Sequence, residues 1–227
     1  MGWHAMKKNK GFWYRLLKAT FARRTLLRFL QNEAVLDMQL KGDILDLGGN
    51  SKSQYYKYLN ISDDSNLTYA DKYDKSNNVI NMDFTRPFPI KDKQYDYVLL
   101  MNVIEHLSDY DLCLAETKRV LRKEGRLTGV VPFLFPVHMV PDDFHRPTES
   151  SLYLSLKNAG FSTIEVVAIG EGRWVAAANL CGQRIKFKPL TLLMYLAAFF
   201  LDGIDKETTK VVKGRIAFPL GYLFKAQ

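Results

Sequence analysis

The sequence predicts an α/β protein with a doubly wound, mostly parallel sheet of seven strands, and three observations lead to this class. Short apolar runs alternate with helical patterns, which is the order expected for a parallel sheet with helices on both faces. Several of these runs end on an acid or a glycine turn. The chain has 227 residues, enough for one large core, and it shows no internal repeat.

Seven segments fit buried or half-buried strands because they are short, apolar and bounded by turn residues. The predicted strands are residues 43–47, 67–71, 78–83, 95–102, 126–132, 162–169 and 219–227. Capping residues predict two helices between these strands. Ser108 is expected to begin a helix that includes Arg122 and ends at Gly125, and Thr148 to begin one over residues 149–159.

Residues 1–40 are predicted to form a basic, aromatic, helical arm. The net charge is +8, and residues 1–32 hold eight basic residues and no acidic one, so this segment accounts for all of it. The basic residues are Lys7, Lys8, Lys10, Arg15, Lys18, Arg23, Arg24 and Arg28. Trp3 is among the aromatic ones. The segment lacks the apolar run and cleavage site of a secretory signal.

Two interpretations of the arm stay open. In the first, the arm packs across the domain with a solvated basic face. Phe12, Leu16, Leu27 and Leu30 lean to one side of a helical wheel, although Arg23 falls among them. In the second, the arm contacts an anionic membrane surface, which attracts basic and aromatic side chains. The same charges would also suit a nucleic-acid backbone.

Residues 171–218 are predicted to be an apolar helical insertion before the last strand. Within it, residues 190–201 are uncharged but too few to span a bilayer, which needs about 20 residues. A buried helix and a helix at a membrane interface both fit. Two cysteines, Cys113 and Cys181, with no CxxC pair predict a reducing, cytoplasmic location, with a peripheral position at the inner face of the membrane as the further expectation. The four histidines suggest no metal site.

The polar residues at the strand ends describe an adenosine site. Asp46 can anchor the turn after the first strand, and Gly48 and Gly49 let its backbone approach a ligand closely. Asp71 stands where a carboxylate accepts hydrogen bonds from ribose hydroxyls, and Asp83 lies one strand further out, within reach of an adenine amino group. The turn lacks GxGxxG spacing, which weakens the case for NAD or FAD.

The ordered segments "ILDLGGN", "YADKYD", "NMDF", "YDYVLLMNVIEHL" and "LRKEGRL" resemble the class I S-adenosylmethionine-dependent methyltransferases, nearest the bacterial methyltransferase type 11 or 12 group. The resemblance covers about residues 43–170 and implies a Rossmann-like core over 41–170, with a last strand at 219–227 that runs antiparallel. It implies S-adenosylmethionine as the cofactor. The residues that it assigns to the cofactor are Asp46, Gly48, Gly49, Asn50, Asp71, Lys72, Asp83, Phe84, Asn102 and Val103.

The loop "PFLFPVHMVPDDFHRPT" follows the fifth predicted strand and is expected to cover the acceptor side. The candidate catalytic residues are His138, His145 and His106, and the candidate substrate-binding residues are Phe133, Asp142, Asp143 and Arg146. Structural roles fit equally well. Asp142 or Asp143 can pair with Arg146 to cap the loop, and His106 can bond to the first helical turn.

The predicted function is S-adenosylmethionine-dependent methyl transfer to an oxygen or nitrogen of a small-molecule, glycan or lipid-linked acceptor, by in-line displacement. A non-catalytic binding module with the same fold and an NAD-dependent oxidoreductase are the alternatives. The fourth predicted strand is followed by "NVIE" rather than an "NPPY"-like quartet, so methylation of nucleic-acid bases is not expected.

Overall fold

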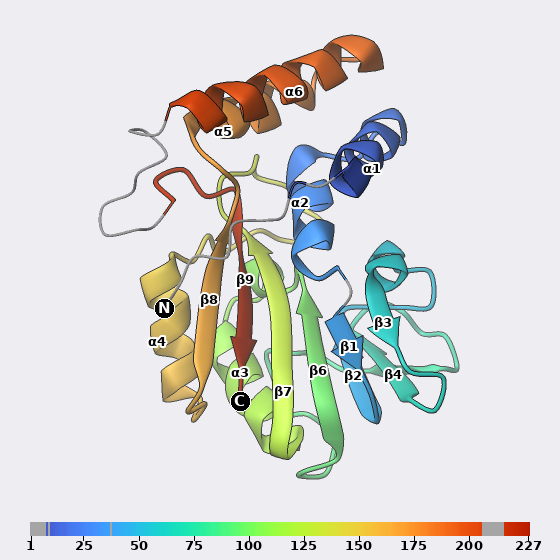
Figure 1. Ribbon diagram of the computed structural model, residues 1–227. Coiled ribbons are helices and arrows are strands. Elements are labelled where there is room, and N and C mark those ends of the chain that lie inside the picture. The colour runs from blue at the N-terminus through green and yellow to red at the C-terminus, as the bar shows by residue number, and fades with distance from the viewer. Residues whose placement is uncertain (1–7, 9, 37, 206–215) are drawn as a thin grey trace. The chain divides into compact units, whose positions relative to one another are not determined.

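The computed structural model describes residue 8 and residues 10–36, 38–205 and 216–227 (Figure 1). Trp3 and Lys7 of the expected arm lie outside these residues. The chain divides into two compact units. The sheet unit contains Val35–Val131, Val137–Val166 and Leu223–Gln227, and the helical unit contains Met1–Ala34, Pro132–Pro136 and Val167–Tyr222.

The main sheet has seven strands in the order β5-β4-β2-β6-β7-β9-β8, which confirms the predicted fold class. The central pairs, β2 with β4 and β6, β4 with β5, and β6 with β7, are parallel. The strands are β2 (Asp43–Leu47), β4 (Asn66–Asp71), β5 (Val79–Asn81), β6 (Tyr95–Met101), β7 (Leu121–Pro132), β8 (Ile164–Ile169) and β9 (Gly221–Ala226).

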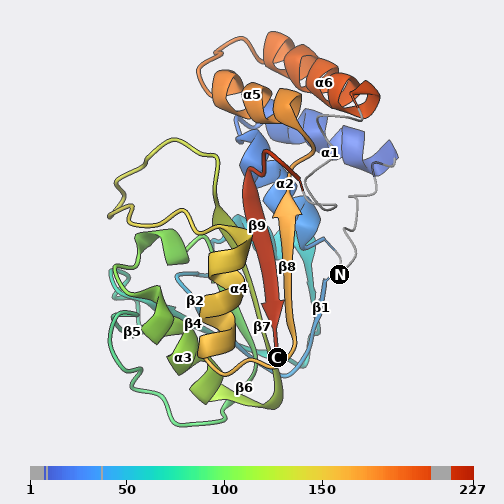
Figure 2. The same cartoon turned by 90° about the vertical axis from the view of Figure 1, so that its left-hand side faces the viewer.

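The last strand enters the sheet antiparallel, as expected. Thr163 and Gln227 exchange both backbone hydrogen bonds, at 3.1 and 2.9 Å, which is the pattern of an antiparallel pair. Figure 2 shows β9 running opposite to β8. A second, two-stranded sheet pairs β1 (Met38–Leu40) with β3 (Leu59–Ile61), and the sequence did not predict it.

The helices of the sheet unit are α3 (Tyr110–Val120), α4 (Glu149–Asn158) and the short 3-10 turns η1 (Gln54–Tyr58) and η2 (Ile104–His106). Figure 2 shows α3 and α4 on one face of the sheet. Thr148 caps α4 as predicted, because its hydroxyl accepts a hydrogen bond from the Ser151 N–H.

Both predicted ends of α3 were wrong. Asp109, not Ser108, caps the helix, and its carboxylate accepts from the Leu112 N–H at 3.1 Å. The helix stops at Val120, so Arg122 lies in β7. There the Arg122 guanidinium donates to Asp43 and Asp96 at 2.7 and 2.5 Å. Arg122 therefore pairs with acids distant in the sequence rather than completing the last turn of the helix.

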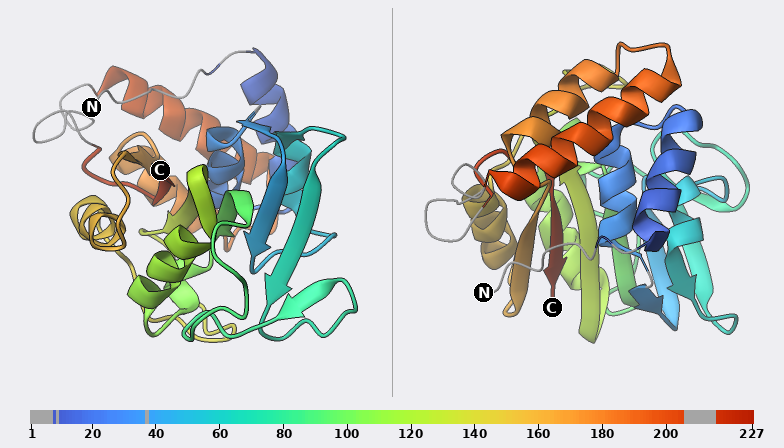
Figure 3. Two further views of the ribbon diagram at one scale, coloured as in Figure 1. Left: turned by 90° about the horizontal axis from the view of Figure 1, so that it is seen from below. Right: turned by 45° about the horizontal axis from the view of Figure 1, so that its top comes forward.

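The helical unit contains α1 (Lys10–Phe21), α2 (Leu26–Ala34), α5 (Arg173–Gly182) and α6 (Lys188–Ile204). Figure 3 shows α5 and α6 side by side. The Phe12 ring lies 5.1 Å from that of Phe29 and 5.7 Å from that of Phe199, in edge-to-face arrangements that join α1 to α2 and α6. In the described part of the chain, no helix has both the length and the apolar character needed to cross a bilayer.

The arm forms two helices rather than one. Arg23 has a φ of 58° in the turn between α1 and α2, so it does not share a helical face with the apolar residues. Phe12, Leu16, Leu27 and Leu30 are all buried within the helical unit. The turn therefore removes the conflict that a single helix would have placed on that face.

One glycine of the sheet is required by close packing. A Cβ added to Gly129 of β7 would lie 2.2 Å from the Phe224 ring and 2.6 Å from the Leu100 carbonyl oxygen. Gly129→Ala is expected to lower the free energy of unfolding by about 1–3 kcal/mol, measured by urea denaturation. The control is Gly203→Ala in the last turn of α6, where the added Cβ meets no described heavy atom within 4 Å and no loss of stability is expected. Wild-type stability of Gly129→Ala would contradict this packing.

Candidate functional site

A cavity of about 330 Å³ opens at the carboxyl ends of the parallel strands, entirely within the sheet unit. This is the edge where ligands of such sheets bind, and the volume lies in the range of small-molecule sites. Seven of the ten predicted cofactor residues line it, namely Gly48, Asp71, Lys72, Asp83, Phe84, Asn102 and Val103. His106 and Asp142 line it as well. The lining residues that the sequence did not indicate are Tyr73, Thr85, Leu107, Ser108, Pro141 and Phe144.

Another cavity, of about 400 Å³, lies in the sheet unit near the opposite ends of the strands. It is lined by Tyr97 near the start of β6, by Thr163 just before β8 and by Gln227 after β9. The amino ends of parallel strands are not where such folds bind ligands, so this cavity is not the candidate site.

The turn after β2 needs both of its glycines. Gly48 has a φ of 81°, in the left-handed region, and an added Cβ would lie 2.7 Å from the Val103 side chain. At Gly49, an added Cβ would lie 2.2 Å from an Asp46 carboxylate oxygen and 2.4 Å from the Tyr55 hydroxyl. The backbone therefore passes close to β6 and directly over a buried carboxylate.

Asn50 takes the place of a further glycine by shaping the turn with its side chain. Its Oδ1 accepts a hydrogen bond from the Lys52 N–H at 2.9 Å, and its own N–H donates to the Ser53 hydroxyl at 3.1 Å. Asp46, Gly49 and Asn50 support the turn and do not line the cavity. Of the turn residues predicted to bind the cofactor, only Gly48 lines the cavity, and the other three fix the path of the backbone around it.

Asp46 is completely buried beneath the turn. The hydroxyls of Tyr55 and Tyr56 both donate to its Oδ2, Tyr55 at 2.5 Å. Burial raises the pKa of Asp46 to about 7, and the two hydrogen bonds oppose this rise. The sequence analysis missed both tyrosines. They follow Asp46 in a segment whose 3-10 turn points them back to the acid.

Asp71 and Lys72 follow β4, at the cavity wall. Asp71 Oδ1 accepts from the backbone N–H groups of Tyr73 and Asp74, at 2.6 and 2.8 Å, and so holds the turn after the strand. Lys72 extends to Asp83, with its Nζ 2.8 Å from Oδ2. The ends of β4 and β5 are thus joined by an ion pair at the cavity.

Asp83 is a fully engaged acid. Its Oδ1 accepts from the Thr85 N–H and hydroxyl at 3.0 and 2.8 Å, in addition to the Lys72 pair on Oδ2. The hydrogen bond from Lys72, followed by that from the Thr85 backbone, lowers the pKa of Asp83 to about 2. The carboxylate is therefore charged at neutral pH.

Asn102 directly follows β6 and has a left-handed conformation, with a φ of 61°. Asparagine tolerates this region better than most residues do. Its N–H still donates to the Val130 carbonyl of β7 at 2.9 Å, so the chain turns sharply while remaining hydrogen-bonded to the sheet. The turn directs η2, with Glu105 and His106, along the cavity edge.

The loop after β7 is fixed by an acid and an arginine. Arg146 donates two hydrogen bonds to the Asp143 carboxylate, the Nη2 bond at 2.5 Å, and the His138 N–H donates to Asp143 at 2.9 Å. Burial acts to raise the pKa of Asp143, but these donors outweigh it and lower the pKa. The capping role weighed for Asp143 and Arg146 is present in the structure.

Two further predicted residues lie away from the cavity lining. The His145 ring packs against Tyr110, with centroids 5.1 Å apart, and its Nε2 lies 3.4 Å from the Ser108 carbonyl. Phe133 belongs to the helical unit, where its ring packs 5.7 Å from that of Tyr222. His106, by contrast, lines the cavity directly.

Comparison with known proteins concerns the class of domain and the fold. Residues 49–128 match the family model described as a methyltransferase domain. The comparison with curated proteins found no match. Among solved structures, a SAM-dependent methyltransferase from Archaeoglobus fulgidus is 14% identical, with 94% of this chain and 99% of that chain covered and a TM-score of 0.52.

A second structure, from Thermotoga maritima, is described as a SAM-dependent methyltransferase and possible histamine N-methyltransferase. It is 13% identical, with 94% of this chain and 92% of that chain covered and a TM-score of 0.51. At this identity the likeness concerns the fold. The family match identifies residues 49–128 as a methyltransferase domain, and the fold is that of S-adenosylmethionine-dependent methyltransferases, which indicates S-adenosylmethionine as the cofactor.

The buried acid gives a pH-dependent stability. Asp46 ionises near pH 3.8 when unfolded but near pH 7 when folded, so the unfolded chain releases this proton first and stability from this group falls as pH rises between these values. The free energy of unfolding of Asp46→Asn minus that of the wild type should therefore rise by about 2–3 kcal/mol as the pH is raised from 5 to 8. Urea denaturation at each pH measures this difference. Parallel pH profiles for the two proteins would contradict the raised pKa.

Proposed function

We propose that the protein transfers the methyl group of S-adenosylmethionine to an oxygen or nitrogen of a small-molecule, glycan or lipid-linked acceptor. The observation that carries this proposal is the convergence of the ends of β2, β4, β5 and β6 on one cavity, beside the loop that follows β7. That convergence supplies a wall for an adenosyl group and, next to it, polar groups for a second ligand.

On this proposal, Asp71 binds the ribose hydroxyls, and Asp83 and Phe84 flank the adenine. Gly48 has no side chain, so the ligand can lie close to its backbone. The space beside it is narrow, since an added Cβ would lie 2.7 Å from the Val103 side chain. Asn102 and Val103 face the methionine end. The Lys72–Asp83 ion pair then forms part of the wall rather than a contact that the ligand must displace.

The bound cofactor supplies a sulfonium-linked methyl group whose sulfur departs neutral. The protein's contribution is alignment of the acceptor with that methyl group, since no acid is needed for the leaving group. His106 lines the cavity and can accept a proton from a hydroxyl or ammonium acceptor. His138 lies behind it, with ring centroids 5.0 Å apart. Asp142 and Phe144 supply a polar and an apolar contact on the same side.

Binding experiments separate this function from the alternatives. Calorimetric titration should give binding with S-adenosylmethionine and S-adenosylhomocysteine and none with NAD. Asp71→Asn should weaken binding about tenfold to a hundredfold, because one charged hydrogen-bond acceptor is worth about 1.5–3 kcal/mol. This variant keeps an oxygen that can accept from the Tyr73 and Asp74 N–H groups, so the turn is preserved.

The matched control is Asp92→Asn, an acid that pairs with Arg119 and does not line the cavity. It should bind as the wild type does. Absence of binding by both adenosyl ligands would reject the proposal, and binding of NAD instead would favour the oxidoreductase. Cofactor binding without release of S-adenosylhomocysteine from a panel of acceptors would favour a non-catalytic module.

We further propose that the helical unit contacts an anionic membrane surface. One face of α6 exposes apolar side chains at helical spacing, including Leu193 and Phe200, which are 63% and 68% exposed. Helix α1 exposes Tyr14 and Phe21 in the same unit, with Lys18 above the Tyr14 ring at 4.5 Å. Basic side chains beside exposed aromatic ones match the chemistry of an anionic lipid interface.

Sedimentation with vesicles tests this contact. The protein should pellet with vesicles rich in phosphatidylglycerol at low salt and remain in solution with phosphatidylcholine alone, because the charge of the arm supplies part of the attraction. The combined change Leu193→Glu and Phe200→Glu should abolish pelleting. The control, Leu154→Glu, alters an exposed leucine of α4 in the sheet unit. Equal pelleting of both variants would reject α6 as the contact.

A further inference from the structure

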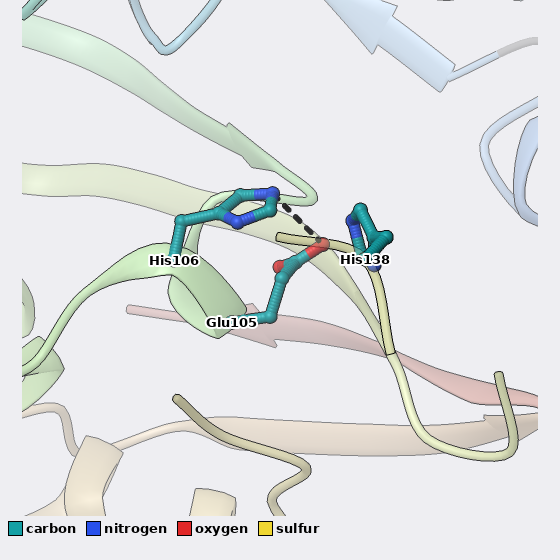
Figure 4. Close-up of side chains that lie close together, drawn as sticks. All are labelled: Glu105, His106 and His138. Atoms are coloured by element: carbon teal, nitrogen blue, oxygen red, sulfur yellow. Dashed lines mark ion pairs between the residues drawn. The ribbon is translucent and has the colours of Figure 1, made fainter. Parts of the chain in front are cut away.

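Glu105, His106 and His138 bring one carboxylate and two imidazoles together from two separate segments of the sheet unit (Figure 4). One donor atom from each lies within 4.8 Å of the other two. Glu105 and His106 belong to η2, after β6, and His138 belongs to the loop after β7. The sequence suggested no metal site, since the third residue is far from the first two along the chain.

We propose that these three side chains bind one divalent transition-metal ion of the Zn²⁺ type. Two imidazole nitrogens and one carboxylate oxygen form a donor set that suits zinc and its neighbours, whereas calcium and magnesium prefer oxygen donors alone. Glu105 is completely buried, and a cation stabilises the charged form of a buried carboxylate.

The contacts around His106 are those of a metal ligand. Its Nδ1 lies 2.5 Å from the Asp142 carbonyl oxygen, which can only accept, so Nδ1 carries the proton. The neutral ring then presents the Nε2 lone pair, and Nε2 lies 3.9 Å from Glu105 Oε1. A backbone carbonyl that fixes the tautomer in this way is the usual outer partner of a ligating histidine.

Both segments are fastened to each other beside the cluster. The Glu105 carbonyl accepts from the Phe144 N–H at 2.7 Å. Asp143 accepts from the His138 N–H and lies 3.5 Å from His138 Nδ1, and Arg146 in turn holds the Asp143 carboxylate. The buried Asp143 therefore borders His138, the Asp142 carbonyl orients His106, and the backbone of Glu105 is fixed by Phe144.

The donor atoms need to move closer to bind one ion. Ligands of tetrahedral zinc lie about 2.0–2.1 Å from the metal and so about 3.4 Å from each other. His138 is the member able to move, because its loop forms neither helix nor strand and its side chain is about one-third exposed, whereas Glu105 is enclosed. Binding is expected to draw His138 toward η2.

An ion here would border the cavity, since His106 is part of its wall. Three protein ligands leave a coordination position for an outside donor. With its Nε2 on the ion, His106 does not act as a base, and a hydroxyl acceptor held on the ion loses its proton to water more readily. The oxygen lone pair then bonds to the methyl carbon while the carbon–sulfur pair stays on sulfur. This step rests on the proposed methyl transfer and names hydroxyl compounds as the acceptor class, whereas the metal site itself does not depend on it.

The test uses untagged protein treated with EDTA and dialysed. Titration with Co²⁺, followed by its visible absorption, and with Zn²⁺ by calorimetry should give one ion per chain. His138→Ala and Glu105→Gln should each weaken binding at least tenfold. The control is His145→Ala on the same loop, whose ring packs against Tyr110 and should leave binding unchanged.

Circular dichroism establishes that each variant is folded, and His138→Ala decides the outcome because its loop is partly exposed. Unchanged binding of Co²⁺ and Zn²⁺ in folded His138→Ala would overturn the site, as would the absence of stoichiometric binding in the wild type. Titration of the EDTA-treated protein with S-adenosylhomocysteine separates the two proposals. Cofactor binding without metal binding rejects only the metal site, and metal binding without cofactor binding rejects only the methyl transfer.

Discussion

The candidate site depends on the burial of Asp46 under the turn that follows β2. The carboxylate and its two tyrosine hydroxyls fill the space where a Cβ of residue 49 would lie, so the turn holds its path only with glycine there. Gly48, next to it, approaches Val103 of the neighbouring connection. A polar cluster with no access to the cavity thereby sets how closely a ligand can approach the backbone. The raised pKa of Asp46 is the cost of placing that acid inside the core.

The acids at the strand ends serve the structure as well as the proposed ligand. Asp71 holds the turn after β4 with one oxygen, and Asp83 holds Thr85 with one oxygen and Lys72 with the other. Such bonds hold the carboxylates in position before a ligand arrives, which reduces the ordering needed on binding. They also mean that replacing an acid by alanine disturbs the cavity wall together with the contact.

Within the helical unit, some aromatic residues of the basic arm are buried and others are exposed. Phe12 and Phe29 are buried against Phe199, while Tyr14 and Phe21 remain exposed beside basic side chains. Packing and surface contact are therefore not exclusive interpretations of this segment. Helix α1 thus has one face packed in the core of the unit and another with exposed aromatic and basic side chains.

The sequence by itself determined the seven strands, the Thr148 cap and part of the cavity wall, because these follow from local patterns: apolar runs, a capping hydroxyl, and glycines and polar residues at strand ends. Lys72, Phe84 and Val103 of the wall came from the resemblance to a known family instead. The sequence did not determine the end of α3, since Arg122 lies in β7 and pairs with Asp43 and Asp96, which are distant in the sequence. Tertiary structure alone brought Tyr55 and Tyr56 onto Asp46 and placed His138 beside Glu105 and His106. These associations join segments whose separation along the chain carries no periodic signal, so only the folded sheet decides them.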